Sequence, residues 1–99
     1  MICVIATIET APGRRDDLLA VFKTLVPQVR AEAGCLEYTP SIDVDCEYVT
    51  ARPDVVTVVE KWESVAALQA HLATSHMANF RTVTADMRLT LSLQVVEPA

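Results

Sequence analysis

The sequence predicts an α+β fold built from four strands and two helical regions. Apolar residues alternate with polar ones, or run together, over residues 2–9, 35–44, 55–63 and 89–96, which is typical of strands. Helical spacing of apolar residues appears over 14–32 and, in two short stretches, over 64–87. Right-handed crossovers turn this βαββαβ order into a four-stranded antiparallel sheet with helices on one side. We therefore expect residues 1–99 to form a single ferredoxin-like domain.

Two strand–helix boundaries are marked by glycine and proline. Pro12 and Gly13 end the first strand, and the helix over 14–32 follows them. Pro27 lies inside the helical pattern and predicts a kink, because proline removes a backbone hydrogen bond. Gly34 stands where a C′ glycine is expected after this helix.

The second half of the chain begins with a predicted hairpin, whose strands are joined by the polar segment 43–54. Pro40 places the strand 35–44 at an edge of the sheet or at a bulge. The β-branched strand 55–63 suits a central position. The second helical region is expected to be broken in two, with hydroxyl side chains as N-caps: Ser64 for the first part, and Thr74 or Ser75 for the second.

The apolar content exceeds what a single sheet covered by one layer of helices requires. A chain of 99 residues buries roughly 65% of its unfolded surface, yet 52% of these residues are apolar. Both faces of some strands are apolar as well. We therefore expect a second buried surface, most simply the interface of a homodimer.

The charge distribution argues against two classes of partner. The net charge is −5, and the adjacent basic residues Arg14 and Arg15 are followed at once by Asp16 and Asp17. Nucleic acid and anionic membranes both attract clustered Lys and Arg, so neither is an expected partner. The N-terminal residues alternate as a strand does and lack the features of a signal peptide, and no segment approaches transmembrane length.

The three cysteines, Cys3, Cys35 and Cys46, are an odd number without CxxC spacing. Cys3 and Cys35 fall in apolar strand segments, where a free cysteine behaves as a small hydrophobe. A reduced protein in the cytoplasm is the simpler interpretation. Cys35 as a nucleophile is less favoured than an inert buried thiol.

The strand over 55–62 carries the first candidate site residue. Side chains alternate along a strand, so Val56, Val58, Glu60 and Trp62 share one face. A carboxylate between valines is costly unless it is paired or lines a wet cavity. Glu60 therefore either forms an ion pair with an arginine or faces a cavity.

Three further polar residues lie close to this face. His71 falls at the margin of the inward face of its helix, and its ordinary pKa suits a general base. It is equally consistent with a half-buried histidine bonded to a backbone carbonyl. His76 begins the next helix and either contributes to the site or only occupies a turn. Tyr38 either offers a phenol to the site from the neighbouring strand or packs in the core with its hydroxyl group in contact with water.

Several other chemistries lack support in the sequence. Two histidines five residues apart, without a cysteine or carboxylate at ligand spacing, predict no metal site. Gly13 and Gly34 are the only glycines, which rules out the glycine-rich phosphate and dinucleotide motifs. No motif for an organic cofactor is present.

Three segments together resemble the antibiotic biosynthesis monooxygenase domain, and in particular its small bacterial quinol monooxygenases. They are Glu-Ala-Gly-Cys-Leu-Glu-Tyr at 32–38, Val-Glu-Lys-Trp-Glu-Ser at 59–64 and Ala-His-Leu-Ala-Thr-Ser-His-Met at 70–77. The resemblance covers essentially the whole chain. It implies a dimeric α+β barrel in which each protomer holds a cavity between sheet and helices.

The resemblance also implies a reaction. Oxygenases of this family oxidise phenols or hydroquinones with dioxygen and use no metal, flavin or haem, because an electron-rich phenolate can itself reduce dioxygen. The protein then has to bind the ring, remove a proton and exclude water. The roles expected from this are a base, His71; ring contacts, Trp62 and Phe80; an apolar wall, Leu72; polar orienting groups, Tyr38 and Glu60; and secondary contacts, His76 and Asn79.

Alternative functions remain for the same fold. A haem-degrading branch is disfavoured, because Thr7, His71 and Arg81 stand where its Asn, Trp and His are expected. A branch that isomerises small phosphorylated diketones requires a basic clamp, for which Arg81 and Arg88 are candidates. A domain that binds a quinone or another apolar ligand without changing it is the third possibility.

Overall fold

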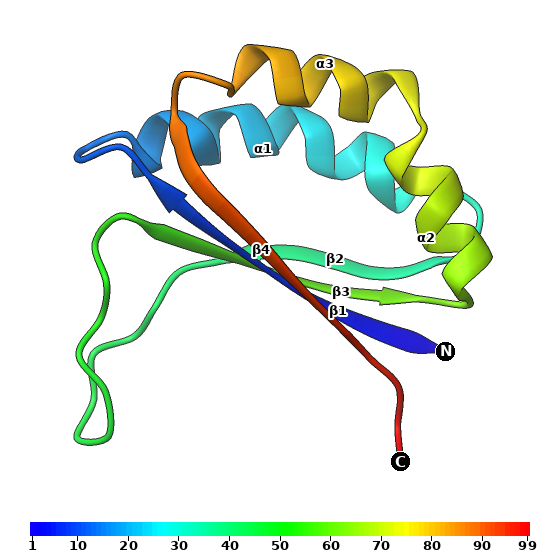
Figure 1. Ribbon diagram of the computed structural model, residues 1–99, viewed down its shortest axis with the longest axis horizontal. Coiled ribbons are helices and arrows are strands. Elements are labelled where there is room, and N and C mark those ends of the chain that lie inside the picture. Colours follow the sequence, from blue (N-terminus) through cyan, green and yellow to red (C-terminus); the bar gives the residue numbers. More distant parts are fainter.

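The computed structural model describes all 99 residues and has the predicted βαββαβ order with a divided second helical region (Figure 1). Its elements lie within a few residues of the expected ranges. They are β1 (Ile2–Thr10), α1 (Arg15–Arg30), β2 (Cys35–Ser41), β3 (Val55–Trp62), α2 (Val65–Leu72), α3 (Ser75–Val83) and β4 (Arg88–Val96).

The four strands form one antiparallel sheet in the order β2-β3-β1-β4, with the helices gathered on one side (Figure 1). The ferredoxin-like α+β fold is therefore confirmed. β2, which contains Pro40, is an edge strand, and β3 lies between β2 and β1, as predicted. Ala6 on β1 is paired with Val58 on one side and Leu93 on the other, so these three side chains share the face toward the helices.

The core lies between this face and the helices. α1 buries the side chains of Leu18, Phe22, Leu25 and Val29, which follow the predicted helical spacing. Phe22 packs against Phe80 of α3 with 4.8 Å between the ring centroids. The sheet and helices thereby bury one continuous apolar cluster that extends beneath α1 and α3.

The prediction for the end of α1 is wrong in one respect. The helix continues through Pro27 to Arg30, its C-cap is Ala31, and Gly34 lies beyond the C′ position in the turn before β2. Gly34 has φ +83°, and a Cβ there would lie 2.7 Å from the Cβ of Ala67. The glycine is therefore needed for a left-handed conformation and for a close approach to α2, rather than for ending the helix.

Hydroxyl side chains cap the N-termini of both α2 and α3, and the cap of α3 lies at the break between the two helices. The Ser64 side chain accepts a hydrogen bond from the backbone N–H of Ala67, and Thr74 accepts one from Met77. Thr74 is thus the cap among the two predicted alternatives. Because the chain turns here, side chains from the end of α2 and the start of α3 approach the same point near the end of α1.

β4 retains an exposed apolar surface. None of the three helices makes extensive contact with it. Its apolar side chains are between 42% and 60% exposed: Leu89, Leu91, Leu93, Val95 and Val96. No helix combines the length and the apolar character needed to span a membrane.

Candidate functional site

A cavity of about 90 Å³ lies between the sheet and the helices and opens toward β4 and α3. Most of its wall is apolar, and its polar side chains come from β2, β3, α2, α3 and the start of β4. The lining residues are Ala6, Ile8, Phe22, Tyr38, Val58, Glu60, His71, Leu72, Met77, Phe80, Arg81, Arg88, Leu91 and Leu93.

Glu60 projects from the central strand β3 into this cavity. Its side chain is buried, has no arginine partner, and accepts a hydrogen bond of 2.9 Å from the indole N–H of Trp62. Burial raises the pKa of the carboxyl group to about 7, although the bond from Trp62 favours the charged form. Both protonation states of Glu60 are consequently accessible near neutral pH.

Tyr38 reaches the cavity from the edge strand β2. Its phenol has no hydrogen-bond partner in the protein, and no fully buried polar side-chain atom is left unpaired, so the hydroxyl faces open cavity space. Burial raises the pKa of Tyr38, and the carboxylates of Glu60 and Glu32 raise it further. The phenol therefore stays protonated and can donate a hydrogen bond to a ligand.

The His71 side chain contacts two aromatic rings and one carboxylate. Its ring lies 4.6 Å from the Trp62 ring and 5.6 Å from the Tyr38 ring, measured between centroids. Its Nδ1 lies 2.9 Å and 3.2 Å from the two carboxylate oxygens of Glu32. Its Nε2 has no protein partner and, by the same reasoning as for Tyr38, borders the cavity. The backbone-carbonyl bond considered from the sequence is not the one formed.

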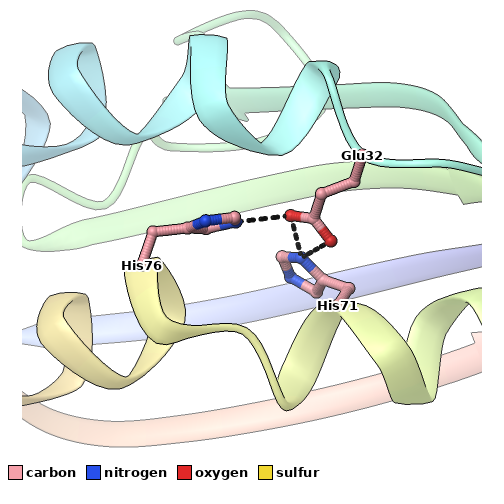
Figure 2. Close-up of side chains that lie close together, drawn as sticks. All are labelled: Glu32, His71 and His76. Atoms are coloured by element: carbon pink, nitrogen blue, oxygen red, sulfur yellow. Dashed lines mark hydrogen bonds and ion pairs between the residues drawn. The ribbon is translucent and has the colours of Figure 1, made fainter.

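Glu32 is the site residue that the sequence analysis missed. It lies in the turn after α1 and joins both histidines, with its Oε2 also 2.7 Å from Nε2 of His76 (Figure 2). Its side chain is 11% exposed, and that of His76 is 21% exposed. The sequence motif at 32–38 contains this glutamate, but its partners lie 39 and 44 residues further along the chain.

Glu32, His71 and His76 also form a group of potential metal ligands. The sequence shows no carboxylate near the histidines, but the fold brings Glu32 to them, and one carboxylate and two imidazoles are suitable ligands for zinc. The contacts of 2.7–2.9 Å are charge-assisted hydrogen-bond lengths, and they satisfy Nδ1 of His71 and Nε2 of His76 without a cation.

Only some of the residues predicted to contact the substrate line the cavity. Phe80 and Leu72 line the cavity. Trp62 is fully buried behind its wall, where it packs on His71 and bonds to Glu60. Asn79 and His76 do not line this cavity but border a smaller depression of about 40 Å³ between α1 and α3.

Cys35 is placed beside the site without the features of a nucleophile. Burial raises the pKa of its thiol, and the Glu32 carboxylate raises it further. A thiol that resists ionisation is a poor nucleophile, which fits the inert role expected from the sequence.

Comparison with known proteins places these features in a family context. The family model described as "Antibiotic biosynthesis monooxygenase" matches residues 1–83. The probable quinol monooxygenase YgiN of Escherichia coli K12 is 35% identical over 102 residues, which cover 99% of this chain and 98% of that protein. The crystal structure of PA3566 from Pseudomonas aeruginosa has a TM-score of 0.85 and 28% identity, with 99% of this chain and 93% of that one covered. A crystal structure of an antibiotic biosynthesis monooxygenase has a TM-score of 0.83 and 27% identity, covering 100% and 99%.

Proposed function

The chain belongs to the antibiotic biosynthesis monooxygenase family, and from this premise we propose that it oxidises a small hydroquinone or phenol with dioxygen without a bound cofactor. The observation that carries the proposal is the cavity, in which one unpartnered imidazole nitrogen, one phenol and one carboxyl group face a mostly apolar space that Arg81 and Arg88 also line. The E. coli relative is named a probable quinol monooxygenase, which agrees with this substrate class.

His71 is the proposed base. Its Nε2 borders the cavity, and the Glu32 carboxylate beside Nδ1 stabilises the positive charge that the ring acquires when it takes a proton. Removal of the substrate hydroxyl proton yields an electron-rich phenolate, the species that can reduce dioxygen. The apolar wall then keeps water from the anion.

The substrate itself supplies the electrons in this proposal. A hydroquinone with a free ring position loses two electrons and two protons to become a quinone and gains one hydroxyl oxygen, so that one O2 gives a hydroxyquinone and one water. The protonated Tyr38 and the titratable Glu60 are proposed to orient the substrate oxygens through hydrogen bonds. Phe80 and Leu72 are proposed to contact the ring.

The size of the cavity favours a homodimer as part of the proposal. A volume of about 90 Å³ is small beside the roughly 300–1,000 Å³ of typical ligand pockets, and its open side is formed by the half-exposed Leu91 and Leu93. A second protomer that covers the apolar surface of β4 would enclose a larger substrate. The three free cysteines support the further proposal that this assembly works in the reducing cytoplasm.

Labelled oxygen tests the proposed reaction. A reduced naphthoquinone incubated with the protein under 18O2 is expected to give a hydroxyquinone that contains one 18O atom, as measured by mass spectrometry. Product formed at the autoxidation rate, across a panel of phenols and quinols, would contradict the proposal. Tight retention of a quinone by such an inactive protein would instead identify a ligand-binding domain.

One observation favours a second candidate, isomerisation of a small phosphorylated diketone. Arg81 and Arg88 both line the cavity, and two guanidinium groups there could bind a phosphate. Each already donates to a backbone carbonyl, Arg81 to Leu72 and Arg88 to Arg81. Turnover of such a substrate without oxygen consumption would favour this function.

A further inference from the structure

The geometry points to Glu32 as a positioning residue that fixes the tautomer of His71, with His76 as the anchor that holds Glu32 in place. This inference rests on the proposed function in one respect: the tautomer that it assigns is the one His71 needs in order to act as a base. The inference is based on the contacts of Glu32, in the turn after α1, with His71 at the end of α2 and His76 at the start of α3 (Figure 2).

The tautomer follows from the donors and acceptors in the cluster. A carboxylate can only accept hydrogen bonds, and both oxygens of Glu32 face Nδ1 of His71 at 2.9 Å and 3.2 Å. Nδ1 must therefore carry the proton. A neutral imidazole has a single N–H, so Nε2 keeps its lone pair, and Nε2 is the nitrogen that borders the cavity.

His76 supplies a second, independent contact. Glu32 lies in the turn after α1, where its backbone N–H donates to the Val29 carbonyl, but this backbone bond does not fix the position of its side chain. Nε2 of His76 lies 2.7 Å from the Glu32 oxygen that also faces His71, and at that distance it donates to the carboxylate. His76 thus restrains Glu32, although it does not line the cavity.

The arrangement explains why two histidines serve one site. His71 is almost fully buried against Trp62 and Tyr38, whereas His76 is partly exposed and lies outside the cavity. The break between α2 and α3 lets both rings approach Glu32 from different helices. A carboxylate that orients a buried imidazole is the arrangement by which hydrolytic triads select the reactive tautomer.

The first test uses the spectroscopic signature of His71, which does not depend on activity. In the wild-type protein at a pH where His71 is neutral, 15N NMR is expected to show the Nδ1–H tautomer. Glu32→Gln replaces one of the two acceptor oxygens with an NH2 donor and removes the negative charge that favours Nδ1–H, so the population should shift toward Nε2–H. Glu37→Gln makes the same change in β2, five residues further along the chain, and should leave the His71 signals unchanged.

The second test is kinetic and uses quinol oxidation. Glu32→Gln should lower kcat by roughly 10–100-fold, the loss typical when a hydrogen-bonding partner that orients a metal-ligating histidine is replaced, with little change in KM. His76→Gln retains an N–H donor and should keep most of the rate, whereas His76→Ala should lose several-fold. Glu37→Gln should behave as wild type, and circular dichroism should show each variant folded.

The outcomes separate this inference from the proposed function. A wild-type His71 with its proton on Nε2, or a tautomer unaffected by Glu32→Gln in a folded protein, would overturn the inference. So would one equivalent of zinc bound to the purified protein, because a cation on Nδ1 would replace its proton. A protein that oxidises no quinol but shows the expected tautomers would contradict the function and leave the positioning role supported.

Discussion

At the scale of single residues, Glu60 shows how a buried carboxyl group links stability to pH. Its pKa is raised from 4.5 to about 7 because burial disfavours the charged form. The folded state therefore holds this proton more tightly than the unfolded state. Proton binding by Glu60 therefore makes its full contribution to the free energy of unfolding below pH 4.5. This contribution is lost as the pH rises through 7, where the folded protein releases the proton.

Glu60→Gln tests this linkage, since the amide keeps the shape and can still accept the Trp62 hydrogen bond. The variant and the wild type should have similar unfolding free energies near pH 4. At pH 8 the variant should be more stable by about 3 kcal/mol, the equivalent of the pKa shift. Urea unfolding from pH 4 to 8 measures both curves, and parallel curves would show that Glu60 is not desolvated.

The same variant separates the cavity role from the ion-pair role considered for the sequence. A buried ion pair broken by Glu60→Gln would strand an arginine and lower stability by roughly 3–5 kcal/mol, whereas the structure shows no such partner. We expect altered pH dependence of turnover with no loss of stability. Unchanged turnover together with a large fall in melting temperature would contradict this expectation.

Residues of the site differ in how far the sequence reveals them. Strand alternation places Glu60 on the buried face, and helical spacing brings His71 to the inward margin, because both patterns are local. Glu32 has no such local pattern. Its contacts with His71 and His76 depend on how the turn after α1 packs against α2 and α3, which only the assembled fold determines.

At the scale of elements, Gly34 links the end of α1 to the position of α2. Gly34→Ala adds a Cβ 2.7 Å from that of Ala67 at φ +83°, so the strain of a left-handed conformation adds to a steric overlap. We expect a loss of roughly 2–4 kcal/mol in unfolding free energy. Because Gly34 lies two residues after Glu32, quinol oxidation should fall as well.

Gly13→Ala is the matched control for this prediction. Gly13 also has a positive φ, +78°, but a Cβ there would meet no atom within 4 Å. The change should therefore cost only about 1–2 kcal/mol, the strain alone, and leave the rate unaffected. Equal losses of stability in the two variants would refute the close approach between Gly34 and α2.

The sequence predicts the elements themselves well, because each is encoded by a local pattern. Alternation in β3, the caps Ser64 and Thr74, and Pro40 in the edge strand all agree with the structure. The end of α1 is predicted less well. A glycine after a helix suits both a C′ position and a close approach to another element, and the sequence does not distinguish these uses.

At the scale of the whole molecule, the exposed apolar strand β4 leads to the prediction of a dimer. No helix covers this strand, and five of its apolar side chains are exposed, of which Leu91, Leu93 and Val95 share one face: Leu89, Leu91, Leu93, Val95 and Val96. An obligate interface of roughly 2,000 Å² or more would bury such a surface, and the melting temperature should then rise with protein concentration. A monodisperse monomer at micromolar concentration in light scattering would contradict the prediction.

Oxygen uptake with a reduced naphthoquinone, compared between the wild type and His71→Ala, tests the central claim that the cavity performs base-assisted oxidation. The wild type should consume dioxygen well above the autoxidation rate. The variant should lose roughly 10²–10⁴-fold of that rate, the usual contribution of a general base. A folded His71→Ala protein that consumes oxygen as fast as the wild type would contradict the account.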